Sequence, residues 1–319
     1  MHARSRVTSF ATLACAVTLA ALVAGCGVGG GAALGTKDNP IKMAFVPSAD
    51  SQKVLSSGEP LGQLLEKETG YSFKVSVPTS YAAVVEAMGA SNVDVGWLAT
   101  FAYVLARDKF GAEVILATVR QGSKSYTGQI LVHADSGISN IEQLRGKTFA
   151  FVDPSSASGY LYPNALFKQK ISDYSDSFFG ERIFAGGHDK VVIAVYNKQV
   201  DGGATFGDSV IGGPPTDART VVRNTIPDVM EKVKTIAITD PIPNDTVSVR
   251  KGLAPDMLTK LREGLLNVAQ TDDGKKALKD LYQIDGLAPA MDADYNPVRD
   301  AARVLNLNLE QELAPKPKA

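Results

Sequence analysis

Residues 149–163, FAFVDPSSASGYLYP, decide the fold of this chain. The run FAFV is apolar and predicts a buried strand, and YLYPNALF, which starts at Tyr160, has the apolar spacing of a helix. Between them lie small residues, 155–159, which therefore form a strand-to-helix turn. Backbone N–H groups at a helix start have no acceptor within the helix, and together with the helix dipole they favour a bound anion. The stretch thus predicts both a β–α unit and an anion site.

The same alternation extends to both sides of this turn. A helix before Gly70 has Leu61, Leu64 and Leu65 on one face, and a second helix starts at Thr79 or Ser80 and ends near Gly89. A capping box, Ser139-x-x-Glu142, opens a short helix, and the chain beyond residue 254 is expected to be helical without further strands. Strands are predicted at 41–47, 73–77, 113–119, 127–134, 149–152 and 233–240. The order predicts an α/β fold with mainly parallel sheets.

The first residues carry an export signal. Arg4 and Arg6 form a basic segment, residues 8–24 are almost entirely apolar or small, and the sequence LVAGC ends at Cys26. This pattern is typical of a signal peptide over 1–25, and LVAGC resembles a bacterial lipobox in which Cys26 becomes lipid-modified. Residues 26–39 are rich in glycine and predict a flexible tether. The expected location is the cell envelope, with the chain anchored in a membrane through its lipid.

Composition limits the remaining choices. Cys15 is removed with the signal and Cys26 is acylated, so the exported chain is expected to have no disulfide. After removal of the signal, 31 basic residues face 34 acidic ones, and the chain therefore lacks the basic surplus of a nucleic-acid-binding protein. The length suffices for one large or two medium domains.

Three separated segments then carry a resemblance to a known family. They are FVDPSSASGYLYP, FAGGHDKVVIAVYNKQVDGGATF and TDPIPND, and YAAVVEAM and VDVGWLATFAYVLA upstream agree with them in order and spacing. The chain resembles the phosphonate/phosphite-binding family of periplasmic solute-binding proteins over most of residues 40–250. The resemblance implies a two-lobed type II periplasmic binding protein with a ligand cleft between the lobes. It also implies a small phosphorus oxyanion as ligand and the permease and ATPase of an ABC importer as partners.

The expected lobes follow from the strand pattern and the resemblance together. Residues 40–126 and 241–319 are assigned to lobe one, and residues 127–240 to lobe two. Ligands of such folds lie at the carboxyl ends of strands, where helix N-termini converge. We expect a monomer without a cofactor or a metal.

The resemblance names the residues that would hold the oxyanion. Ser156, Ala157 and Ser158 form the turn, where the family commonly has threonine in place of Ala157, and Tyr81 and Tyr126 stand where family tyrosines reach the ligand. Without the resemblance, the serines could be helix caps and each tyrosine a half-buried core residue. Trp97, the only tryptophan, could line the cleft or pack under the following helix.

Two further side chains concern ligand selection. His188 follows Gly186-Gly187 at a helix start, and the resemblance makes it a donor to the ligand; it could also lose its charge near the reference pKa of about 6.5. Asp208 resembles the acidic cleft position of the family and would select ligands that carry a proton or an amine. Its alternative role is an N-cap for the segment that follows it.

Hydrolysis and sensing are the alternatives to solute import. Ser158, His188 and either Asp189 or Asp208 could be arranged as a triad, but the chain lacks a G-x-S-x-G elbow, and His133 and His188 lack the spacing of a metal hydrolase. We therefore expect no enzymatic activity. The alternative that stays open is an anchored sensor that presents an oxyanion such as arsenite or phosphite to a membrane kinase.

Overall fold

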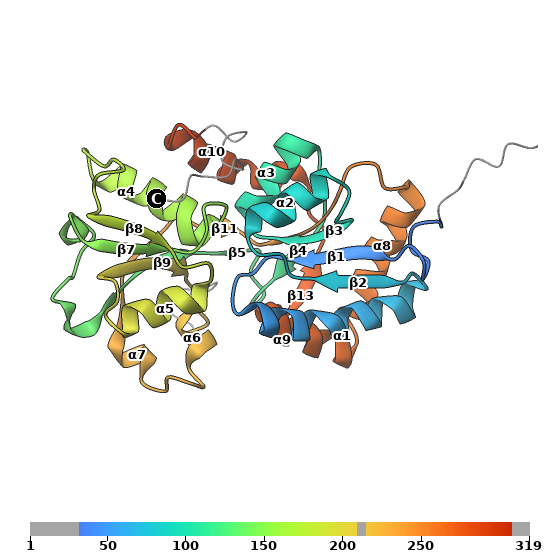
Figure 1. Cartoon of the computed structure of the whole chain (residues 1–319), viewed down its shortest axis with the longest axis horizontal. Helices are drawn as coiled ribbons and strands as arrows, with labels where there is room; N and C mark the ends of the chain where they lie inside the picture. Colours follow the sequence, from blue (N-terminus) through green and yellow to red (C-terminus); the bar gives the residue numbers. More distant parts are fainter. Residues whose placement is uncertain (1–31, 209–214, 308–319) are drawn as a thin grey trace, which may run out of the picture.

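The computed structural model describes residues 32–208 and 215–307, and all but two of its strands form two separate sheets that are each covered by helices (Figure 1). The sequence prediction of an α/β fold is therefore confirmed. The predicted signal peptide and Cys26 lie outside the described residues. No helix in the described part of the chain combines the length and the apolarity that crossing a bilayer requires.

The first sheet has six strands, and its middle is built from distant parts of the sequence. Strands β1, β2 and β3 pair in parallel, whereas β12 inserts antiparallel between β3 and β4, and β13 closes the β4 edge. In sheet order the strands are β13 (Gly286–Ala288), β4 (Glu113–Val119), β12 (Thr246–Val249), β3 (Val95–Leu98), β1 (Ile41–Phe45) and β2 (Phe73–Ser76).

Helices cover both faces of this sheet because β1 is apolar on both sides. Met43 and Phe45 pack in one core, with α1, α8 and α9, and Ala44 packs in the other, with α2 and α3. These helices span Ser51–Thr69 (α1), Tyr81–Gly89 (α2), Thr100–Phe110 (α3), Pro255–Val268 (α8) and Asp272–Tyr282 (α9). Ser80 caps α2 by accepting from the backbone of Ala83, as predicted.

The second sheet has five strands and contains the turn that opened the sequence analysis. Strand β7 pairs in parallel with β8 and β9, and β6 pairs antiparallel with β9 and β10. In sheet order these are β10 (Val233–Ile238), β6 (Gly128–His133), β9 (Gly202–Phe206), β7 (Thr148–Phe151) and β8 (Glu181–Phe184). The accompanying helices are α4 (Tyr162–Lys170), α5 (His188–Tyr196), α6 (Arg219–Val222) and α7 (Val229–Lys232).

A two-stranded sheet connects the two lobes. Strand β5 (Ser125–Tyr126) pairs with β11 (Ile242–Pro243), so both crossings lie side by side in the middle of Figure 1. The lobe boundaries after residues 126 and 240 stay predictions; β5 ends at the first of these positions and β11 begins close to the second. The last helix, α10 (Asn296–Val304), lies in a segment expected in lobe one, yet it contacts α3 of that lobe and α4 of the other.

Three local expectations are wrong. Both sheets are mixed rather than mainly parallel, because each crossing strand returns antiparallel to its neighbours. The tail expected to be helical contributes β13, which is too short for a periodic signal, and β12 just before it was not predicted. The Ser139–Glu142 capping box does not form, because the short 3₁₀ helix starts only at Glu142 and has no side-chain cap; Asn140 accepts from the backbone of Gln143 at 3.2 Å, and the backbone N–H of Ser139 donates to the Gln143 side chain.

Candidate ligand-binding site

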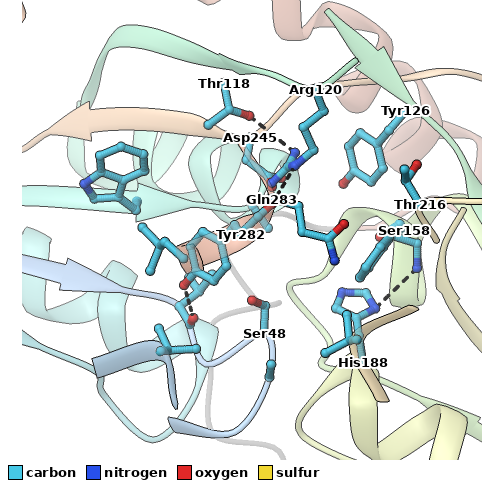
Figure 2. A pocket seen from close by; sticks show the side chains of 18 of the residues that line it. Ser48, Thr118, Arg120, Tyr126, Ser158, His188, Thr216, Asp245, Tyr282 and Gln283 are labelled. Atoms are coloured by element: carbon cyan, nitrogen blue, oxygen red, sulfur yellow. Dashed lines mark hydrogen bonds and ion pairs between the residues drawn. The ribbon is translucent and has the colours of Figure 1, made fainter. Parts of the chain in front are cut away.

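A cavity of about 510 Å³ lies between the two lobes, where the carboxyl ends of β1, β3, β7 and β9 meet. Ligand pockets commonly form at such strand ends. Both lobes and the connecting strands contribute polar side chains to its wall (Figure 2). The polar residues of this wall include Ser48, Tyr81, Arg120, Gln121, Tyr126, Ser156, Ser158, His188, Thr220, Asp245 and Gln283.

The serine-rich turn forms the lobe-two side of the cavity. Residues Ala157–Leu161 make a π-helical turn ahead of α4, and Ser156 caps it by accepting from the backbone N–H of Gly159 at 3.0 Å. The Ser156 hydroxyl therefore has the capping role that was the alternative to ligand contact, although it also lines the cavity. Ser158, two residues further along, is 2% exposed and also lines the cavity. The first N–H groups of the turn have no acceptor inside the helix, as an anion site requires.

Tyr81 and Tyr126 approach the turn from the other side. Both tyrosines line the cavity and are almost fully buried, and the Tyr81 hydroxyl has no hydrogen-bond partner among the described residues. Burial raises the pKa of both phenols, an effect that hydrogen bonds to Ser158 and Thr100 partly oppose at Tyr126. Both hydroxyls therefore stay protonated and can donate to an anion.

A carboxylate ties the turn to the tyrosine helix. Asp153 accepts from the backbone of Ser155 at 2.8 Å and from the backbone of Tyr81, across the lobes, at 3.4 Å. The start of α2 is thereby held against the turn. This contact explains how a tyrosine of lobe one reaches an anion site of lobe two.

His188 is a neutral donor with a fixed tautomer. Its Nδ1 accepts from the backbone N–H of Phe206 at 3.3 Å and lies 2.8 Å from the Thr205 hydroxyl. Because Nδ1 is an acceptor, the proton is on Nε2. Burial, with a smaller effect from the Arg120 charge, lowers the pKa of His188 to about 3. The expectation that this histidine changes charge near pH 6.5 is therefore wrong for the unliganded protein.

Arg120 faces these donors from lobe one, as Figure 2 shows. Its guanidinium donates to Asp245 at 2.9 Å, to the Thr118 hydroxyl at 3.3 Å and to the backbone carbonyl of Tyr282 at 3.1 Å. These contacts fix the guanidinium in place, and the Asp245 carboxylate offsets its charge. The cavity therefore contains a held cation whose charge is largely balanced.

Two predicted residues do not line the cavity. Ala157 is fully buried at the first position of the turn. Asp208 instead accepts from the backbone N–H of Thr216 at 2.6 Å. Its carboxylate therefore pairs with a backbone group of the following segment, as its alternative role of N-cap would require. The acids that line the cavity are Asp245, Asp280 and Asp285.

The sequence analysis missed Arg120, Asp245 and Gln283. A signal existed for Arg120, which directly follows a predicted strand, at the end where ligand residues collect. Asp245 ends the TDPIPND segment that carries the resemblance, but no role was expected for it because the strand that follows, β12, was not predicted; Gln283 had no local signal. Trp97 does line the cavity, but it does not pack under the following helix: its ring lies 5.5 Å from that of Phe45, in the core shared with α1, α8 and α9. Within the described residues, no group of three or more histidine, cysteine or acidic side chains could hold a metal ion.

Comparison with known proteins agrees with this architecture. The chain is 31% identical over 281 residues to the phosphate-import protein PhnD of Mycolicibacterium smegmatis, which covers 83% of this chain and 85% of that protein. It is 26% identical over 274 residues to the phosphonates-binding periplasmic protein of Escherichia coli, covering 83% and 77% of the two chains.

Two solved structures share the fold. One is a binding protein component of an ABC phosphonate transporter from Pseudomonas aeruginosa, with a TM-score of 0.74, 26% identity, and coverage of 86% of this chain and 92% of that one. The other is PhnD1 of Prochlorococcus marinus in complex with methylphosphonate, with a TM-score of 0.71, 19% identity, and coverage of 83% and 98%. Both likenesses support the two-lobed binding-protein architecture expected from the sequence.

The family profile described as ABC transporter, phosphonate, periplasmic substrate-binding protein matches residues 43–295. Its members bind solutes for transporters and are not enzymes. This chain therefore belongs to the phosphonate family of periplasmic substrate-binding proteins of ABC transporters.

Proposed function

We propose that the cavity binds a small phosphorus oxyanion, namely a phosphonate, phosphate or phosphite, for delivery to the permease and ATPase of an ABC importer. One observation carries this proposal: neutral donors from both lobes converge on the start of a helical turn. They are the Ser158 hydroxyl, the Tyr81 hydroxyl, which has no partner among the described residues, and the Nε2–H of His188. The names of the curated relatives, a phosphate-import protein and a phosphonates-binding protein, support the same ligand class.

Neutral donors suit an anion that must be released again. Each hydrogen bond to a charged acceptor contributes about 1.5–3 kcal/mol, so a few of them give useful affinity without an unpaired buried cation. Arg120, a cation in the cavity wall, is already paired with Asp245. Affinity should therefore depend on directed hydrogen bonds and respond only weakly to salt.

Calorimetric titration tests this proposal. The purified chain is titrated with methylphosphonate, phosphite, phosphate and arsenite, and at least one phosphorus oxyanion is expected to bind with one ligand per chain. Ser158→Ala should weaken that binding, whereas Ser172→Ala, at an exposed serine outside the cavity, should not. Binding of none of the phosphorus oxyanions, or equal binding by both variants, would contradict the proposal.

The N-terminal sequence supports a further part of the proposal, a lipid anchor. Cys26 ends an LVAGC sequence after a signal-like segment, and a glycine-rich stretch separates it from β1. Acylation of Cys26 would hold the binding protein at the membrane that contains its permease. Radiolabelled fatty acid incorporated by the native chain and absent from Cys26→Ala would establish the anchor.

A further inference from the structure

The cavity is larger than a bare oxyanion requires. Its volume of about 510 Å³ corresponds to roughly 17 water molecules at about 30 Å³ each. The donors that grip an oxyanion occupy the lobe-two side, and polar groups of lobe one continue beyond them (Figure 2). A ligand that fills this space would carry a substituent on phosphorus.

The wall that faces this substituent holds two glutamines in a left-handed backbone conformation. Gln121 has φ 51° and Gln283 has φ 55°, and both line the cavity. Only five residues other than glycine have positive φ in the described chain, and the other three are Ser91, Lys198 and Asn306, none of which lines the cavity. Left-handed backbone is costly for a residue with a long side chain and concentrates at ligand sites.

Gln121 also leaves a buried acceptor unpaired. Its side-chain oxygen is inaccessible to solvent and has no hydrogen-bond partner among the described residues. Its backbone N–H donates to Asp285 at 2.6 Å, which holds the turn in place. A buried amide oxygen without a donor costs free energy, and a donor on the ligand would remove that cost.

Gln283 comes from the end of α9 and reaches across the cleft. Its Nε2 donates weakly, at 3.4 Å, to the Thr220 hydroxyl of lobe two, and Figure 2 shows its amide between Tyr282 and His188. The amide can both donate and accept. It is therefore placed to bridge a polar substituent and the second lobe.

The charges of this wall argue against an ionised substituent. Arg120 is paired with Asp245 at 2.9 Å and Lys279 with Asp285 at 2.7 Å, so neither carboxylate is left over for an ammonium group. Asp280 pairs with Lys276, and Lys53 is an exposed residue at the rim. An anionic substituent would likewise find Arg120 already neutralised.

We propose that Gln121 and Gln283, beside the Arg120–Asp245 pair, form a second subsite that selects a neutral, hydroxylated substituent on the phosphorus of the ligand. The inference rests on the proposed oxyanion function and specifies its substrate class. Hydroxyl groups can donate to the Gln121 oxygen and accept from the Gln283 amide at the same time. A plain alkyl substituent can use neither group, and an ammonium group can only donate to the amide oxygens and would bring a second positive charge to the wall that holds Arg120.

A matched ligand series tests the subsite. Propylphosphonate, 2,3-dihydroxypropylphosphonate and 3-aminopropylphosphonate present the same oxyanion with different substituents. By calorimetry, the dihydroxy ligand is expected to bind about tenfold more tightly than either of the others, as two net hydrogen bonds would provide. In Gln121→Gly and Gln283→Gly this preference should fall by about threefold to tenfold.

Glycine is the appropriate replacement because it adopts the left-handed conformation readily, so both variants should fold. Ser91→Gly, at an exposed residue with φ 58°, controls for the loss of a strained residue and should keep the full preference. Equal binding of all three ligands by the native chain, tighter binding of the amino ligand, or an unchanged preference in both glutamine variants would overturn the subsite. Binding of phosphate or phosphite but of no phosphonate would also overturn the subsite, whereas failure of phosphate, phosphite and every phosphonate to bind would instead contradict the oxyanion function itself.

Discussion

The burial of His188 predicts a steep loss of stability in weak acid. Its pKa is about 3 in the folded chain and about 6.5 when unfolded, so the unfolded state takes up a proton over this range while the folded state does not. The stabilisation is therefore complete above pH 6.5 and is lost as the pH falls. Each pH unit costs about 1.4 kcal/mol, which gives about 3 kcal/mol between pH 6.5 and pH 4.

His188→Asn isolates this effect. The asparagine oxygen can stand near the position of Nδ1 and accept from Phe206 and Thr205, while the ionisable ring and its Nε2–H are removed. Urea unfolding at pH 7 and pH 4 should show that the native chain loses about 3 kcal/mol more than the variant. At pH 7 the variant should also bind the oxyanion about 1–3 kcal/mol more weakly.

A second buried histidine provides the control. Burial also lowers the pKa of His133, which does not line the cavity, so His133→Asn reports how much another imidazole contributes. Its oxyanion affinity should match that of the native chain. Equal acid sensitivity of the native chain and His188→Asn would refute the assignment of His188 as a neutral buried donor.

Four further substitutions test the cap at Ser156, the ligand contact at Ser158, the role of Asp208 and the lipid anchor at Cys26. Ser156→Ala should lower the free energy of unfolding by about 1 kcal/mol, because Gly159 loses its cap acceptor, whereas Ser158→Ala should leave thermal denaturation nearly unchanged and weaken oxyanion binding in calorimetry by about 1–3 kcal/mol. Asp208→Asn should leave both affinity and its pH dependence unchanged, because an amide oxygen can still accept from Thr216; a flattened pH profile would show that this side chain faces the ligand. Cys26→Ala should move the chain from the membrane to the soluble fraction with native affinity, and continued membrane retention would exclude the lipid anchor.

Local sequence was sufficient to predict the turn that forms the lobe-two side of the cavity. The alternation of apolar runs with helical spacing predicted the α/β class, and the small residues at 155–159 predicted the turn that Ser156 caps. Both depend on neighbours within a few residues, where periodicity and capping act. The resemblance added Tyr81, Tyr126 and His188, and the structure places all three in the cavity wall.

Most residues of the lobe-one wall of the cavity could be identified only from the tertiary structure. Strand β12 brings Asp245 next to Arg120, although 125 residues separate them, and α9 brings Gln283 to the same cavity. Asp208 shows the reverse case, because a nearby backbone N–H takes up the carboxylate that the sequence would assign to the ligand. Sequence periodicity reports which side of an element is buried, but the pairing of distant strands determines which side chains meet, since it depends on packing across the whole lobe.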